Sequence, residues 1–194
     1  MTAADMGAHE TSAPFAGTRQ GLMVAVGCGA IVFLIGLMVA PERTWGGYLI
    51  GFSYFVGLAL AGLLFLAVLS LARGEWAFPL RRVPEAMAST LPVAAVLGLV
   101  LITGIHTLYE WSHSSVVEGD ALLTHKSTWL NGFGFSVRLV LYFALWIWLG
   151  RRLVLVSRTG DRPAEVRTAA WFLLAFALTF SLASIDWVQS LDPH

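Results

Sequence analysis

Long apolar runs separated by short polar segments dominate the chain. Five runs are long enough to cross a membrane, over residues 21–40, 47–72, 84–109, 131–150 and 166–187. A helix rises about 1.5 Å per residue, so about 20 residues span a hydrocarbon core of about 30 Å. Pro41 ends the first run, and Pro92 predicts a kink inside the third. The pattern predicts an all-α polytopic membrane protein with five transmembrane helices.

The segments outside these runs are short. Residues 1–20 are polar and rich in small side chains, which predicts a flexible tail ahead of a single transmembrane domain over 21–194. The longest connections are expected over about 73–83, 110–130 and 151–165. Small residues recur at helical spacing at Gly47 and Gly51, and again from Ser53 to Gly57 to Ala61. Such rows favour close packing of helices in lipid.

Basic residues are concentrated on one side of the predicted membrane. Nine belong to the N-terminus and the even-numbered loops, namely Arg19, Arg73, Arg81, Arg82, Arg151, Arg152, Arg158, Arg162 and Arg167. Only Arg43 and Lys126 lie on the opposite side. Because translocation of Lys and Arg is disfavoured, we expect a cytoplasmic N-terminus and a periplasmic C-terminus.

Tryptophans fall near both predicted boundaries. Trp45, Trp111, Trp129 and Trp187 lie near the outer one, and Trp76, Trp146, Trp148 and Trp171 lie near the inner one. Indole side chains are typical of membrane–water interfaces. We therefore expect an aromatic belt at each interface.

Composition narrows the classes of function. The chain has 194 residues, of which 57% are hydrophobic and 12% charged, and its formal net charge is zero. A neutral chain offers a nucleic acid no electrostatic attraction, so we expect no nucleic-acid partner. The single cysteine, Cys28, excludes an internal disulfide and a cysteine-ligated iron–sulfur cluster or structural zinc site within the chain.

Arg138 is a permanent charge inside the fourth apolar run. It lies seven residues beyond Asn131, or about 10 Å below the start of the span. A charge facing lipid near mid-membrane costs about 2.5–3.5 kcal/mol on insertion scales. The side chain can either extend to the outer interface or pair with a carboxylate of a neighbouring helix. Glu110 and Asp186 are the candidate partners, since both lie near the outer ends of their spans.

The segment HTLYEWSH at 106–113 contains the other candidate groups. His106, Glu110 and His113 are spaced i, i+4 and i+7, so they share one face if the helix continues through them. Titratable groups on one face suit proton movement or a hydrogen bond to a quinone head group. The alternative is that Glu110 and His113 are solvated loop residues.

Haem and retinal are disfavoured as cofactors. A haem clamped between two helices needs a histidine from each, and His106 and His113 are about 10 Å apart along a single helix. The only lysine, Lys126, lies in a predicted loop, which disfavours a retinal Schiff base. We expect no cofactor bound covalently or by metal ligation, and quinone or quinol is the remaining candidate.

Two stretches and the arginine-bearing connection between them resemble a known family. They are WLNGFGFSVRLVLYFALWIWLGRRL at 129–153 and ASIDWVQSLDPH at 183–194. They resemble the ActF-type integral membrane subunit of bacterial alternative complex III, a quinol:cytochrome c oxidoreductase. The matching positions are Leu130, Asn131, Arg138, Asp186, Trp187, Ser190 and Leu191.

The resemblance implies a location and partners. It implies a bacterial inner-membrane protein, distantly related to NrfD-like and polysulfide-reductase anchors, with helices in up-and-down four-helix bundles. It implies a sister NrfD-like membrane subunit and periplasmic haem and iron–sulfur subunits as partners. It also implies that the subunit carries no haem or cluster of its own and is a candidate for quinone binding or proton conduction. Family members continue with a second half, so we expect the sequence to correspond to the N-terminal half.

We therefore expect spans two to five to form an antiparallel four-helix bundle with span one outside it. The expected function is a non-catalytic or accessory subunit of a respiratory quinol:electron-acceptor oxidoreductase. The expected polar cluster is His106, Glu110, Arg138 and Asp186, with Tyr109 and Tyr142 as candidate quinone or hydrogen-bond partners. In it, His106, Glu110 and Asp186 would relay protons, and Arg138 would compensate charge. The alternatives are half of a secondary transporter working as a homodimer and a purely structural membrane anchor.

Overall fold

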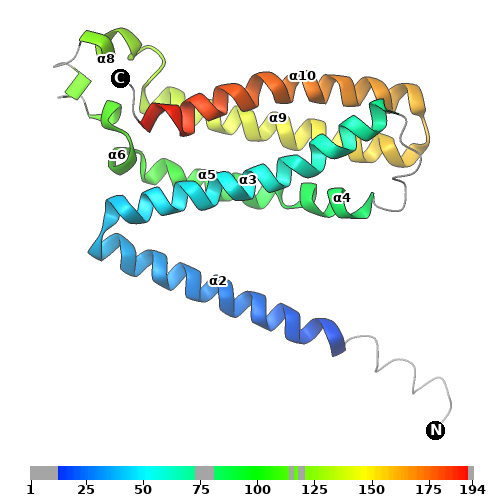
Figure 1. Cartoon of the computed structure of the whole chain (residues 1–194), viewed down its shortest axis with the longest axis horizontal. Coiled ribbons are helices and arrows are strands. Elements are labelled where there is room, and N and C mark those ends of the chain that lie inside the picture. The colour runs from blue at the N-terminus through cyan, green and yellow to red at the C-terminus, as the bar shows by residue number, and fades with distance from the viewer. Residues whose placement is uncertain (1–12, 73–80, 114–115, 118–120, 192–194) are drawn as a thin grey trace. The chain divides into compact units, whose positions relative to one another are not determined.

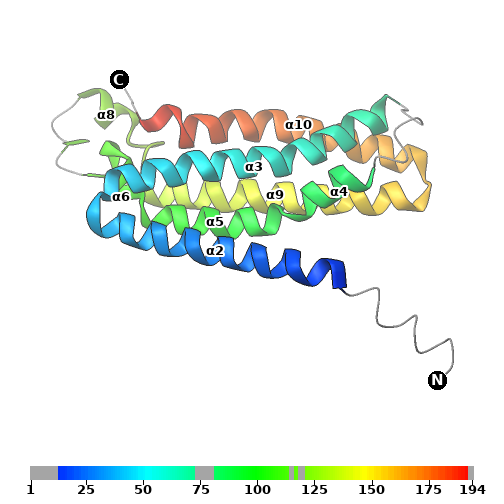
Figure 2. The same cartoon turned by 60° about the horizontal axis from the view of Figure 1, so that its bottom comes forward.

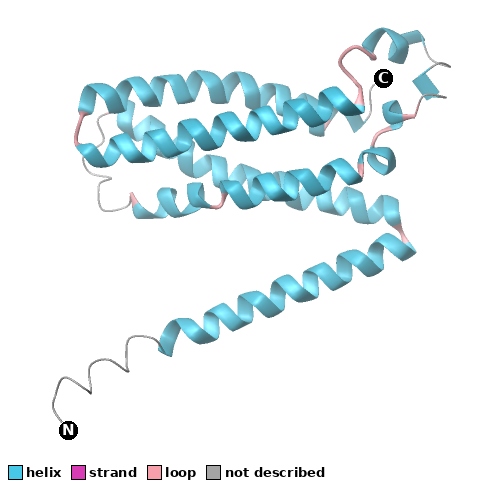
Figure 3. Cartoon of the chain, turned by 180° about the vertical axis from the view of Figure 1, so that it is seen from behind, coloured by secondary structure: helices cyan, strands magenta, loops and turns pink. Residues whose placement is uncertain are grey.

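The structure, a computed structural model, describes residues 13–72, 81–113, 116–117 and 121–191. Helices make up nearly all of this part of the chain, and the described residues contain no strand (Figures 1 and 3). The predicted flexible tail over 1–20 falls mostly outside the described residues, and α2 (Ala13–Val39) already covers its last part. The all-α fold class is confirmed.

Five helical segments are long and apolar enough to cross a membrane. They are Thr18–Val39, Pro41–Leu71, Arg82–Thr103, Gly132–Thr159 and Arg162–Leu191. The five predicted spans correspond to them one by one, although the boundaries differ. Pro41 separates α2 from α3 (Pro41–Leu71), because proline lacks a backbone N–H but fits the first turn of a new helix.

The chain divides into two compact units, residues 1–44 and 45–194. The first contains α2 and the first four residues of α3, and the second contains the rest of α3, the other described helices and the candidate site. Within the second unit, α3, α5 (Leu91–Thr103), α9 (Gly132–Thr159) and α10 (Arg162–Trp187) run side by side (Figures 1 and 2). They share one apolar core, in which Phe52, Phe143 and Trp187 bring together rings from three of these helices.

The third predicted span is a broken helix. It consists of α4 (Arg82–Ser89), α5 and the single turn α6 (Ile105–Leu108). The break lies at Thr90, two residues before Pro92, where the hydroxyl of Thr90 donates to the Met87 carbonyl oxygen (2.7 Å). The predicted kink is therefore present, because proline removes a helix hydrogen bond and is best placed in a first turn.

The predicted long connection over 151–165 is instead a tight turn between two helices. The α9 helix continues nine residues beyond the apolar run to Thr159, and α10 starts at Arg162. Gly160 has a φ of 77°, a left-handed conformation that glycine adopts without a steric penalty at the end of a helix. Asp161 then caps α10 by accepting a hydrogen bond from the Ala164 backbone N–H (3.1 Å).

Most of the described indoles do not form an interfacial belt. Trp45, Trp111, Trp146 and Trp187 are buried in the second unit, whereas Trp129, Trp148 and Trp171 are exposed. The predicted belt is therefore wrong for these four buried side chains, which pack as core residues because their rings fill space between helices. Trp76 lies outside the described residues.

Glycines allow close helix approach, but at other positions than the predicted small-residue rows. Side chains built at Gly47, Gly51 or Gly57 would meet nothing within 4 Å. A Cβ at Gly62 would instead lie 2.6 Å from the Pro84 carbonyl oxygen, and one at Gly150 would lie 2.6 Å from Leu63. The close approaches therefore join α3 to α4 and to α9.

The contrast between two glycines of α3 gives a test. Gly62→Ala should destabilise the protein by about 1–3 kcal/mol, because the new methyl group meets backbone that cannot rotate away. Gly57→Ala on the same helix should be neutral or slightly stabilising, since it gains helix propensity without a clash. Thermal unfolding of the full chain in detergent, followed by circular dichroism, compares the two. Equal midpoints would contradict the tight α3–α4 contact.

Candidate functional site

The candidate site begins where α9 begins. The side chain of Asn131 accepts a hydrogen bond from the Gly134 backbone N–H (2.6 Å), so Asn131 is the N-cap of this helix. Its amide nitrogen donates to the carbonyl oxygens of Ser127 and Thr128. These bonds fix the direction in which the chain enters α9 and thus the face on which Arg138 lies.

Arg138 pairs with Asp186 of α10. Nε donates to Oδ2 (2.8 Å) and Nη2 donates to Oδ1 (2.9 Å), the two-point geometry in which arginine and carboxylate are most complementary. The Asp186 side chain is 1% exposed and that of Arg138 is 15% exposed. Of the two predicted partners, only Asp186 makes this contact.

Two further donors complete the coordination of the Asp186 carboxylate. The indole N–H of Trp129 donates to Oδ1 (2.9 Å), and the hydroxyl of Tyr142 donates to Oδ2 (3.0 Å). Each oxygen thus accepts two hydrogen bonds, and a carboxylate has about four acceptor positions in all. All four positions are therefore occupied by donors of the protein.

The guanidinium of Arg138 is also shielded on its own helix. The central carbon of the guanidinium, Cζ, lies 4.3 Å from the centre of the Trp129 ring, which is a cation–π contact. Its Nη1 would lie 2.9 Å from a Cβ at Gly134, one turn nearer the start of α9. The side chain thus extends toward the N-terminal end of α9, as helical side chains do, and pairs with a carboxylate as well.

The residues that follow Asp186 extend the network. The hydroxyl of Tyr109 donates to the Trp187 carbonyl oxygen (3.0 Å), and the indole of Trp111 donates to the Ser190 carbonyl oxygen (3.1 Å). The hydroxyl of Ser190 donates to the Asp186 carbonyl oxygen. Burial raises the pKa of Tyr109 above its usual range, and the Asp186 charge adds to that effect. Tyr109 therefore acts here as a neutral hydrogen-bond donor.

His106 and Glu110 lie outside this network, and the predicted shared face of His106, Glu110 and His113 is wrong. The helix ends at Leu108, Tyr109 is extended (φ −120°, ψ 118°), and a 3-10 turn, η2 (Glu110–Ser112), follows. Glu110 and both histidines are exposed. The two imidazoles nevertheless approach each other, with ring centres 5.8 Å apart. The prediction of a shared face fails because the helix is interrupted at Gly104 and again at the extended Tyr109. The i, i+4, i+7 spacing rule holds only for a continuous helix.

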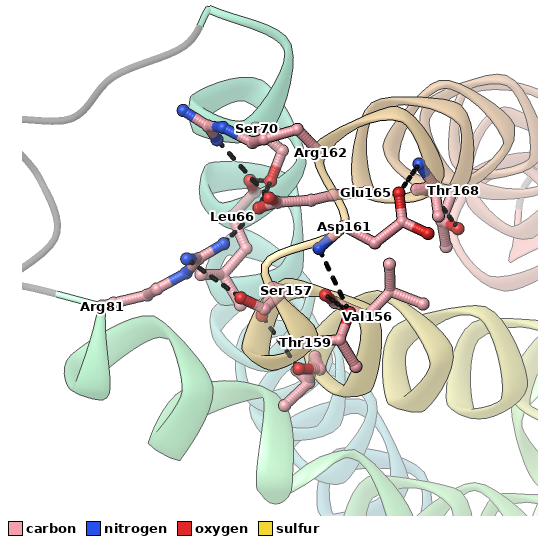
Figure 4. Close-up of polar contacts among 12 residues, drawn as sticks. Leu66, Ser70, Arg81, Val156, Ser157, Thr159, Asp161, Arg162, Glu165 and Thr168 are labelled. Atoms are coloured by element: carbon pink, nitrogen blue, oxygen red, sulfur yellow. Dashed lines mark hydrogen bonds and ion pairs between the residues drawn. The ribbon is translucent and has the colours of Figure 1, made fainter.

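A second buried carboxylate lies at the opposite end of α10. The Glu165 side chain is 2% exposed, accepts a hydrogen bond from Ser70 (2.8 Å), and forms an ion pair with Arg81 (Figure 4). Arg162 lies 3.4 Å from its other oxygen. Glu165 therefore connects α10 to α3, through Ser70, and to Arg81, the residue before α4.

The two carboxylates mark the two ends of the apolar part of α10. They are 21 residues apart, or about 31 Å along a helix, close to the thickness of a hydrocarbon core. Phe172, Phe176 and Phe180 stack along the same helix between them. The described ion pairs of α10 thus lie in two terminal clusters, and the intervening segment has aromatic packing and a hydrogen bond from the Trp146 indole to Thr179 (2.7 Å).

Sequence reasoning missed Trp129 and Glu165 as members of these clusters. Glu165 carried a detectable signal, since it is an acid inside the arginine-rich segment 151–167 and four residues after a helix-capping aspartate. For Trp129, the sequence contains no signal of membership in the Asp186 cluster beyond its position near a span boundary. No group of His, Cys, Asp and Glu side chains suited to hold a metal ion is found in the described part of the chain.

The fold and the two clusters define a class of protein, a multi-pass helical membrane protein with charged pairs buried near the ends of its spans. Comparison with protein-family models and with curated proteins finds no match to this chain.

The two predicted partners of Arg138 give a test by substitution. Asp186→Asn should cost about 3–5 kcal/mol of unfolding free energy, because it leaves the guanidinium buried without a counter-charge. Glu110→Gln should change it by less than about 0.5 kcal/mol, since Glu110 is exposed. Thermal unfolding in detergent measures both. If Glu110→Gln lost more unfolding free energy than Asp186→Asn, the counter-charge of Arg138 would be Glu110 instead.

A paired replacement separates the charge from the packing. Arg138→Met combined with Asp186→Leu should lose less stability than Asp186→Asn alone, because no unpaired charge remains. The residual cost should be about 1–3 kcal/mol, because the buried Tyr142 hydroxyl is left unbonded, whereas the exposed Trp129 indole can donate to solvent. The same unfolding assay tests this order. A double variant less stable than the single one would contradict it.

Proposed function

We propose that the chain is an accessory, integral membrane subunit of a respiratory quinol:electron-acceptor oxidoreductase of the alternative complex III type. The partners are a sister NrfD-like membrane subunit and periplasmic haem and iron–sulfur subunits. In this proposal the N-terminus is cytoplasmic, spans two to five form an antiparallel four-helix bundle in the bacterial inner membrane, and span one lies outside it.

The observation that carries the proposal is the clustering of the residues that carry the family resemblance. They lie in two segments about 55 residues apart in the chain, yet they meet at one end of the second unit. Asn131 caps α9, Arg138 binds Asp186, and Ser190 binds the Asp186 carbonyl oxygen. A family pattern whose residues lie at one end of the unit, with Arg138 and Ser190 both bound to Asp186, is better explained by a shared architecture than by chance similarity of apolar sequences.

An accessory role is favoured over a catalytic or proton-conducting one. The Asp186 carboxylate already accepts four hydrogen bonds, so it has no free acceptor position for a proton or a quinol hydroxyl. The hydroxyls of Tyr109 and Tyr142 already donate to the protein. The pairing of Arg138 with Asp186 holds α9 against α10 and includes Tyr142, and the Tyr109 bond joins the end of α10 to the residue after α6.

Isolation of the intact assembly tests the proposal. The full chain, tagged and expressed in its native membrane, should co-purify after mild solubilisation with multihaem and iron–sulfur subunits, detected by haem absorbance and mass spectrometry. A chain that purifies as a homodimer without these subunits and gives substrate-dependent flux in vesicles would contradict it and would support the transporter alternative.

A second measurement separates the accessory role from a proton relay. In the assembled complex, the Arg138→Met and Asp186→Leu double variant should keep quinol turnover and proton translocation per complex within about twofold of the unaltered complex. A relay group contributes about 10²–10⁴-fold to a proton-transfer step, so a loss of that size would identify Asp186 as a relay. Turnover is expressed per haem, which removes the effect of reduced assembly.

A further inference from the structure

A groove opens between α9 and α10 at the arginine-rich end of the second unit. Its volume is about 500 Å³. The α9 wall consists of Leu145, Trp148, Leu149 and Arg152, and the α10 wall consists of Arg167, Thr168, Trp171 and Ala175. Residues spaced by three or four lie on one face of a helix, so each wall is a single continuous stripe.

The two stripes match in layers because α9 and α10 are joined by a tight turn and run in opposite directions. Arg152 and Arg167 form the layer nearest the turn. Trp148 and Trp171, each four residues from its arginine, form the next layer. Leu145 and Ala175 follow deeper in the spans. The groove thus passes from two cations, through two indoles, to an aliphatic floor over roughly 10 Å.

The two arginines of this groove are not neutralised within the described residues. Both are exposed, and neither forms an ion pair or side-chain hydrogen bond there. The nearest buried acid, Glu165, is already bound by Arg81 and Ser70. Among the described residues, no carboxylate lines the groove.

We propose that this groove binds an anionic phospholipid of the surrounding membrane. Its phosphate would accept hydrogen bonds from Arg152 and Arg167, since guanidinium groups bind phosphate through paired N–H donors. The glycerol-ester region would lie between Trp148 and Trp171, where indoles are favoured at the depth of the head groups. One acyl chain would lie along Leu145 and Ala175. The order of the three layers is that of a lipid monolayer, and basic pockets between transmembrane helices are known to bind anionic head groups.

A neighbouring groove provides the contrast. It lies between α4, α5 and α9, has a volume of about 400 Å³, and includes Arg151 and Arg158. There Arg158 pairs with Glu85 (2.5 Å), which also lines the groove. Its net positive charge is therefore smaller, and an acid stands where a phosphate would bind. Arg151, the residue next to Arg152 but in the other groove, is a matched control.

Native mass spectrometry of the full chain in detergent tests the proposal. The probes are phosphatidylglycerol and phosphatidylcholine with identical acyl chains. We expect preferential retention of phosphatidylglycerol, and we expect Arg152→Gln with Arg167→Gln to weaken it on the order of twentyfold, at about fivefold for each arginine. Arg151→Gln should leave the preference unchanged within about twofold. Inorganic phosphate should not displace the lipid, because it lacks an acyl chain.

Equal retention of the two lipids, or a preference that survives in the double variant, would overturn the proposal. Loss of the preference in Arg151→Gln alone would overturn it as well and would place the lipid in the other groove. If the double variant does not fold, the unaltered chain still decides the matter. Its preference for phosphatidylglycerol must fall with rising ionic strength, and a salt-independent preference would contradict binding by the two arginines.

Discussion

The pairing of Arg138 with Asp186 is the constraint on which the end of the second unit where α9 begins depends. A guanidinium about 10 Å inside an apolar span is costly unless a neighbouring helix supplies a counter-charge. Asp186 supplies it, and the carboxylate then fixes Trp129 and Tyr142 through its remaining acceptor positions. One ion pair thus determines the relative positions of α9, α10 and the segment leading into α9.

The Glu165 cluster places a second ion pair at the other end of the same helix. Glu165 and Asp186 are anchored by arginines from other parts of the chain, Arg81 and Arg138. In lipid, apolar helices gain little from burying more apolar surface, so packing and polar contacts determine how they associate. Two ion pairs, each near an end of α10, therefore fix its depth and rotation more firmly than the apolar contacts between them.

The sequence was sufficient for the number of spans and for the breaks before Pro41 and near Pro92, because hydropathy and proline geometry are local. For Arg138 it predicted either extension to the interface or a pair with Glu110 or Asp186, and the contact with Asp186, 48 residues away, required the structure. The shared face of His106, Glu110 and His113 depended on a continuous helix, and the extended Tyr109 interrupts it. Trp129 and Glu165 belong to their clusters through contacts 57 and 84–95 residues away in sequence, which no periodicity encodes.

The distribution of charge also separates two roles that arginine plays in this chain. Arg81 and Arg138 are partly buried and bind carboxylates, so they hold helices together. Arg152 and Arg167 lie on the outside of the α9–α10 pair without a carboxylate among the described residues. The positive-inside rule counts Arg81 together with Arg152 and Arg167, although Arg81 binds a buried carboxylate and the other two are exposed. Glu165 is bound by Arg81 and Ser70, so Arg152 and Arg167 are not needed to hold the helices together. The same arginine-rich end can therefore orient the chain during insertion and, in the proposal above, bind a phosphate afterwards.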